Sequence, residues 1–131
     1  DLKVFINKLD SSEHYAITKG KFLKNRSVRV RVISTNILKN ITNFKKNIFN
    51  SSLKYLTQFN NFALIVVKGA SPDLSSLESN SGILRQYGVG AQIIKELKIK
   101  NMILVSRSKK RIIALNGYGI KIIKQEIIKW L

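Results

Sequence analysis

A cationic segment with a hydroxyl group at its start follows a short apolar run in the second half of the chain. Residues 102–105, Met-Ile-Leu-Val, predict a buried strand. The loop from Ser106 to Arg111 comes directly after this strand and includes Lys109 and Lys110. The carboxyl end of a strand is where α/β proteins usually hold anionic ligands. The chemistry available to these residues is therefore phosphate binding, and the alternative is a solvated run of charges.

Arg85 precedes this strand and adds a second cation to the candidate site. The apolar residues around it recur at the spacing of an amphipathic helix, at Tyr87, Ala91, Ile94 and Leu97. This pattern places Arg85 at the start of the helix, where backbone N–H groups and the macrodipole favour anions. Gly88 and Gly90 lie within the same helix, where we expect them to allow close packing.

The clearest half-buried strand lies near the amino end of the chain. Val28, Val30 and Val32 alternate there with Arg29 and Arg31, which predicts one apolar face and one doubly cationic face. Arg31 either contacts a phosphate ligand, with Ser34 farther along the strand, or simply faces solvent.

The remaining segments complete an α/β (mixed α+β) domain in which a mixed β-sheet is flanked by two main helices. One helix is predicted within residues 41–59, and 69–80 is predicted as loop because it is rich in Ser, Gly, Pro and Asp. One helical turn is expected at 112–115. Further strands are predicted at 2–9, 14–19, 63–67 and 119–128.

Composition limits the class of protein. The 131 residues favour one domain, residues 1–131, and no apolar run approaches the roughly 20 residues of a membrane span. We therefore expect a cytoplasmic protein. Asp1 leads directly into a strand-like pattern, which favours a domain excised from a longer chain. The absence of cysteine excludes disulfides and thiolate metal sites.

The formal net charge of +17 indicates attraction to polyanions such as nucleic acids or nucleotides. Lysine far outnumbers arginine, and Asn and Ile are abundant, so the composition of an AT-rich genome explains the charge equally well. The chain also lacks the interleaved aromatic and basic residues of single-strand binding platforms. A nucleic-acid partner is therefore not expected, although a basic nucleic-acid-binding module remains one alternative function.

Several segments together resemble one enzyme family in the order in which they occur. Residues 85–93, Arg-Gln-Tyr-Gly-Val-Gly-Ala-Gln-Ile, are similar to the Arg-Asp-Tyr-Gly-Ile-Gly-Ala-Gln-Ile segment of GTP cyclohydrolase II, the first enzyme of riboflavin synthesis. Residues 115–120, Leu-Asn-Gly-Tyr-Gly-Ile, resemble the family's Leu-Glu-Gly-Tyr-Gly-Leu turn. Residues 13–20 and 31–34 resemble its Glu-His-x-Ala-Leu-Val-Lys-Gly and Arg-Val-His-Ser segments. The middle of the chain is much shorter than in the family.

The resemblance implies a zinc site that this chain does not retain. The family holds zinc with three cysteines, and their positions fall on Asn36 and near Asn43 and Lys45. The resemblance also makes Arg85 the counterpart of the family's nucleophile, while the assisting aspartate is replaced by Ile83, which cannot accept a proton. We therefore expect no cofactor in this domain and no ring-opening activity.

The resemblance also implies a site and partners. It assigns phosphate or nucleotide binding to Arg31, Ser34, Ser106, Lys109 and Lys110. The expected function is a structural or regulatory role beside the 3,4-dihydroxy-2-butanone 4-phosphate synthase domain to which the family is often fused, with GTP or another phosphate as ligand and a homodimer as the expected assembly. The enzymatic alternative is a divergent GTP hydrolase that releases pyrophosphate through Arg85.

Overall fold

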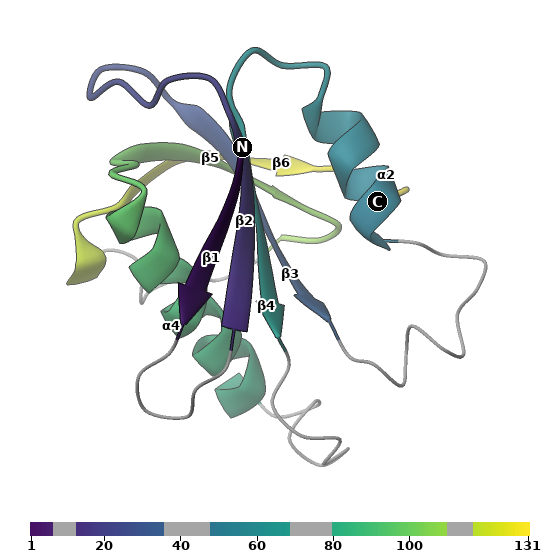
Figure 1. Cartoon of the computed structure of the whole chain (residues 1–131). Helices are drawn as coiled ribbons and strands as arrows, with labels where there is room; N and C mark the ends of the chain where they lie inside the picture. Colours follow the sequence, from purple (N-terminus) through teal and green to yellow (C-terminus); the bar gives the residue numbers. More distant parts are fainter. Residues whose placement is uncertain (7–12, 36–47, 69–79, 110–116) are drawn as a thin grey trace.

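The computed structural model describes five stretches of the chain, with the backbone alone described for Thr35 and for residues 80–87 (Figure 1). The stretches are 1–6, 13–35, 48–68, 80–109 and 117–131. The loop predicted at 69–79, the helical turn at 112–115 and the part of the first predicted strand beyond Ile6 lie outside them.

Within these stretches the strands form a single mixed sheet of six, in the order β1-β2-β4-β3-β5-β6. Strands β1, β2 and β4 pair antiparallel, whereas β4, β3, β5 and β6 are mutually parallel neighbours. The predicted fold class is confirmed. The strands are β1 (Leu2–Ile6), β2 (Glu13–Lys19), β3 (Val28–Thr35), β4 (Phe62–Lys68), β5 (Asn101–Ser106) and β6 (Lys121–Ile127).

Two helices cover opposite faces of this sheet, and each connects two parallel strands (Figure 1). Helix α2 (Ile48–Leu56) lies between β3 and β4 in the chain, and α4 (Asn80–Glu96) lies between β4 and β5. The predicted helix within 41–59 is confirmed over these nine residues of α2. The loop predicted to reach Asn80 is too long by one residue, since α4 begins there. Neither helix is long and apolar enough to cross a membrane.

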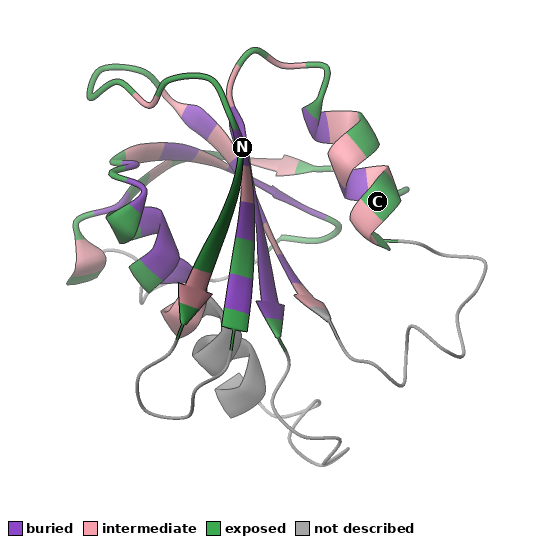
Figure 2. Ribbon diagram, in the orientation of Figure 1, coloured by how far each residue is buried: buried purple, intermediate pink, exposed green. Residues whose placement is uncertain are grey.

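The continuous apolar run of β4 follows from this three-layer arrangement. Six of its seven residues are buried, because α4 covers one face of the strand and α2 covers the other (Figure 2). On the α4 side, Ile94 and Leu97 pack with Ile65. On the α2 side, Leu56 packs with Leu64. The prediction of a central strand at 63–67 is confirmed, since β4 lies between β2 and β3.

The two helical glycines behave differently. A Cβ atom added to Gly90 would lie 3.3 Å from Cγ1 of Val32, so a hydrogen at this position lets α4 approach β3 closely. Close packing is therefore confirmed for Gly90. It is wrong for Gly88, where an added Cβ would meet no atom of the described residues within 4 Å.

Candidate functional site

The candidate site lies where the parallel strands end. Thr35 at the end of β3 pairs with Lys68 at the end of β4. The chain leaves these neighbouring strands toward helices on opposite faces of the sheet, which is the arrangement that forms a ligand crevice in open α/β sheets. Helix α4 runs back against the direction of the strands, so its first turn lies at the same edge (Figure 1).

Three of the predicted phosphate-binding residues lie at this carboxyl edge. Ser34 is half-buried on β3, and Lys109 is exposed shortly after β5. Ser106 is buried at the end of β5, and its hydroxyl donates a 2.7 Å hydrogen bond to the carbonyl oxygen of Ser108. That bond closes a short turn over 106–108, and Lys109 is the next residue. Lys110 lies outside the described residues.

Arg31 belongs to the interior of the domain. Arg31 is only 6% exposed, so the alternative that it simply faces solvent is wrong, whereas phosphate binding by Arg31 stays a prediction. Its Nε donates a 2.7 Å hydrogen bond to Oγ of Ser52 on α2, and its Nη1 lies 3.4 Å from the carbonyl oxygen of Val105. The physical reason is that α2 covers the face of β3 that the sequence pattern assigned to solvent.

Arg85 lies in the second turn of α4 and not at its start, because the helix begins at Asn80. The expected position is wrong because the apolar stripe from Tyr87 onward does not mark the first turn. Asn80 and Ser81 are residue types that favour helix starts, and they extend α4 toward its amino end. The attraction of the helix start for anions falls off within one turn, so it gives Arg85 little support as a phosphate ligand.

The donor chemistry of the chain does not fit zinc. Asn36, Asn43 and Lys45, on or near which the resemblance places the family's zinc ligands, lie outside the described residues. In the part of the chain that the structure describes, no three His, Cys, Asp or Glu residues come close enough to hold a metal ion. Zinc sites use thiolate, imidazole or carboxylate ligands, and the whole sequence has no cysteine and a single histidine.

The single histidine, His14, is buried at the start of β2, and its Nδ1 accepts a 3.1 Å hydrogen bond from the backbone N–H of Lys68. This bond ties β2 to the end of β4.

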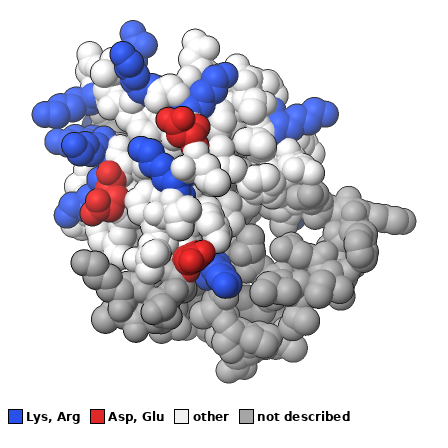
Figure 3. All heavy atoms as spheres, in the orientation of Figure 1, with Lys and Arg blue, Asp and Glu red and all other residues white. Residues whose placement is uncertain are grey.

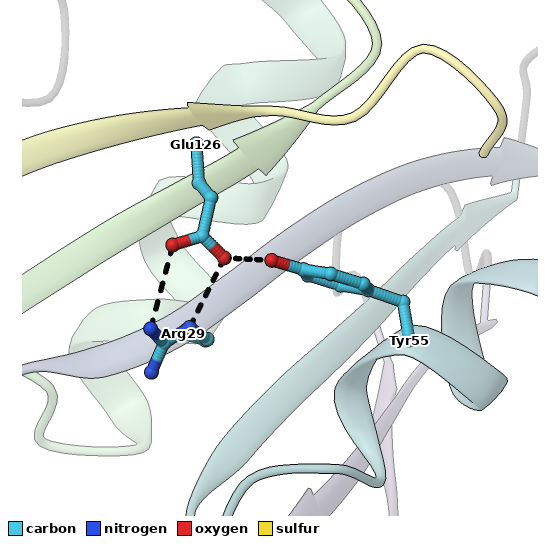
Figure 4. A network of polar contacts seen from close by, with 3 residues as sticks. All are labelled: Arg29, Tyr55 and Glu126. Atoms are coloured by element: carbon cyan, nitrogen blue, oxygen red, sulfur yellow. Dashed lines mark hydrogen bonds and ion pairs between the residues drawn. The ribbon is translucent and has the colours of Figure 1, made fainter.

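Sequence reasoning missed a polar network on the α2 face of the sheet (Figure 4). Arg29 on β3 forms an ion pair with Glu126 on β6, with 3.1 Å between Nε and Oε1 and 3.4 Å between Nη2 and Oε2. The Tyr55 hydroxyl on α2 donates a hydrogen bond to the same carboxylate. The guanidinium of Arg29 also lies 3.6 Å above the centre of the Phe59 ring. The sequence offers a faint signal, a lone Glu on a basic strand, but Arg29 and Glu126 are 97 residues apart.

This network shifts the titration of both acidic groups. Burial alone would raise the pKa of Glu126, but the hydrogen bond from Tyr55 and the hydrogen bonds and charge of Arg29 outweigh it, so this pKa lies below its ordinary value. Burial, followed by the hydrogen bond to Glu126, raises the pKa of Tyr55 to about 12. Tyr55 therefore remains a neutral donor at physiological pH.

We expect Glu126→Gln to lower the free energy of unfolding by about 1–2 kcal/mol at neutral pH, because a charge-assisted pair is replaced by a neutral contact. The carboxylate pKa is lowered on folding, so its contribution is present above the unfolded value of about 4.3 and is lost as the pH falls through the folded pKa. The difference between the two proteins should therefore shrink in acid. Urea unfolding across this range measures it, with exposed Glu96→Gln as control. An equal difference at all pH values would contradict the prediction.

Comparison with known proteins confirms the resemblance that the sequence motifs suggested. Residues 70–127 match the family model of GTP cyclohydrolase II. This stretch contains α4, β5 and the whole of β6.

Curated relatives extend the similarity over most of the chain. A 3,4-dihydroxy-2-butanone 4-phosphate synthase of Photobacterium phosphoreum is 27% identical over 138 residues, which cover 95% of this chain and 38% of the relative. Riboflavin biosynthesis protein RibBA of Aquifex aeolicus (strain VF5) is 39% identical over 46 residues, which cover 35% of this chain and 11% of the relative. The chain thus spans well under half the length of these relatives.

A solved structure shares the fold. RibBX, a two-domain 3,4-dihydroxy-2-butanone 4-phosphate synthase from A. baumannii, aligns with 97% of this chain and with 38% of its own length. The TM-score is 0.55 at 22% sequence identity. The six-stranded sheet with a helix on each face is therefore an arrangement already seen in a larger protein.

Proposed function

The chain is a relative of the GTP cyclohydrolase II family of riboflavin biosynthesis, and on that premise we propose that it is a domain of this type without the ring-opening activity. Its proposed role is that of a structural or regulatory partner of a 3,4-dihydroxy-2-butanone 4-phosphate synthase domain. It keeps part of a phosphate or nucleotide site at the carboxyl edge of the sheet.

The main support for the proposed loss of activity is the absence of cysteine. A hydrolytic zinc site needs three protein ligands and one open position for the water that it activates. The resemblance places these ligands on or near Asn36, Asn43 and Lys45. Amides are poor substitutes for thiolates, and a lysine ammonium repels a divalent cation. No water can then be activated in the manner that the family uses.

The carboxyl edge supports the proposal of residual phosphate binding. The end of β3 supplies Ser34, and the segment after β5 supplies the exposed ammonium of Lys109. Two of the other candidates are less available, since Ser106 closes a turn and Arg31 bonds to Ser52. We therefore expect weak binding of GTP, through phosphate contacts more than through recognition of the base.

The relatives support the proposed partner. Each carries far more chain than these 131 residues, and two are named for 3,4-dihydroxy-2-butanone 4-phosphate synthase. A domain that has lost its own chemistry can persist because it contacts and stabilises a neighbouring catalytic domain. In this proposal the sheet and its helices supply the surface that contacts the synthase domain. Ligand binding at the phosphate site then makes this contact depend on the ligand concentration.

The proposal predicts that the protein releases no formate from GTP, with or without added zinc, and that dialysed protein holds no stoichiometric zinc. Formate measurement and elemental analysis test these two points, with an active zinc-containing GTP cyclohydrolase II as positive control. Formate release above background would overturn the proposal. Release of pyrophosphate that disappears in Arg85→Ala would instead support the hydrolase alternative.

A further inference from the structure

A shallow depression of about 660 Å³ lies at the other edge of the sheet, where the parallel strands begin. Its wall comes from the β2–β3 connection, residues 20–27, and from the α2–β4 connection, residues 57–61. Strands β3 and β4 run away from it toward the candidate site described above. The depression is therefore separated from that site by the length of the sheet.

The charge of the depression is positive. Lys21 and Arg26 line it and are exposed, whereas Arg29 lines it with its charge already paired to Glu126. Among the described residues that line it there is no carboxylate, and within the described stretches neither Lys21 nor Arg26 forms an ion pair. An anion entering the depression therefore meets two cations, each able to form a charge-assisted hydrogen bond.

More cations lie beside it along the same edge. The side-chain amide of Asn101 donates a 3.0 Å hydrogen bond to the carbonyl oxygen of Lys24, which holds the β2–β3 connection against the start of β5. The backbone N–H of Lys121 donates a 2.7 Å hydrogen bond to the carbonyl oxygen of Lys100, so the start of β6 lies beside the start of β5. In Figure 3, Lys and Arg side chains gather over the upper left of the molecule, the region of the β2–β3 connection in Figure 1.

The rest of the lining is suited to the uncharged part of an organic phosphate. Asn25 and Asn60 present exposed side-chain amides, which can donate and accept hydrogen bonds. Leu23 and the Phe59 ring supply apolar contact, and the side chain of Leu23 is 49% exposed. Cations, amides and an apolar wall in one hollow fit a phosphate attached to a sugar or a base.

We propose that this depression binds phosphate groups of a nucleotide-like ligand through Lys21 and Arg26, independently of the carboxyl edge. The ligand has two chemical sources, a free nucleoside triphosphate or the backbone of a single-stranded nucleic acid. The neighbouring lysines at 24, 100 and 121 would extend the surface for the second source.

The test measures binding of GTP and of a short fluorescent oligonucleotide at low salt, by calorimetry and by anisotropy. Lys21→Ala combined with Arg26→Ala should weaken binding at least tenfold, because each charge-assisted contact contributes about 1.5–3 kcal/mol and 1.4 kcal/mol corresponds to a factor of about ten. Lys3→Ala combined with Lys129→Ala, a matched pair of exposed lysines that belong to neither site, should retain this binding. Circular dichroism checks that both variants fold.

The two ligands distinguish the sources. Preference for the oligonucleotide, with affinity that falls steeply as salt rises, identifies the nucleic-acid backbone, whereas equal or tighter GTP binding identifies a free nucleotide. The inference is wrong if neither ligand binds, if the Lys21/Arg26 variant binds normally, or if the Lys3/Lys129 control loses binding to the same extent. None of these results depends on formate release or zinc, so they leave the proposed loss of catalysis to its own test.

Discussion

Arg31→Ala is expected to lower the free energy of unfolding by about 2–4 kcal/mol, because it removes a buried cation and the hydrogen bonds that this cation donates to buried acceptors. Ser52, whose side chain is fully buried, loses the 2.7 Å bond from Nε, and the carbonyl of Val105 loses its contact with Nη1. The vacated volume adds the cost of a cavity. Urea unfolding followed by circular dichroism measures the change.

Two further variants make this result specific. Lys54→Ala, at an exposed position of α2, should change stability by no more than about 0.5 kcal/mol. Ser52→Ala should cost less than Arg31→Ala, and the double variant should cost less than the sum, since both changes remove the same bond. If Arg31→Ala unfolds like the unmodified protein but loses GTP binding, Arg31 serves the ligand and not the fold.

Gly20→Ala is expected to destabilise the domain by about 2–4 kcal/mol, for two independent reasons. Gly20 has a φ of +82°, in the region where a side chain costs about 1–2 kcal/mol. A Cβ atom there would also lie 2.5 Å from the backbone oxygen of Asn60 and 3.0 Å from Cβ of Asn61. Backbone has little freedom to move away, so the β2–β3 connection or the start of β4 must shift. Thermal and urea unfolding measure the loss.

Gly88→Ala is the matched control, because it makes the same substitution inside a helix. An added Cβ at Gly88 meets no atom within 4 Å in the part of the chain that the structure describes, and Ala is favoured over Gly in a helix by roughly 0.5–1 kcal/mol. We therefore expect opposite signs for the two variants. Equal stability changes at positions 20 and 88 would show that neither the backbone angle nor the contact with Asn60 governs the effect.

Strand positions were the most predictable part of this fold. The alternation at 28–32 and the continuous apolar run at 63–67 correspond to β3 and β4, because periodicity reflects directly which faces are covered. Periodicity does not show which element packs against each face. The second face of β3 carries Arg29 and Arg31 and looks solvent-exposed in the sequence, yet α2 and β6 bring partners to both arginines.

The candidate site was predictable where the family motif is local. The residues of 106–109 lie at the carboxyl end of β5, as the strand-and-loop pattern indicated. The position of Arg85 was not predictable, since α4 begins with the polar residues Asn80 and Ser81 followed by Gly, and these three positions carry no apolar periodicity. The Arg29–Glu126 pair was not predictable because only the sheet order, with β5 between β3 and β6, brings the two residues together.

The contact of Gly90 with Val32 links two positions that are far apart in the chain. A Cβ at 90 would lie 3.3 Å from Val32 Cγ1, so Val32 would have to move by a few tenths of an ångström to admit it, and both residues together set the separation of α4 from β3. A larger residue at 90 is accommodated more easily when the residue at position 32 is smaller. Homologous sequences should therefore tend to vary at these two sites in concert.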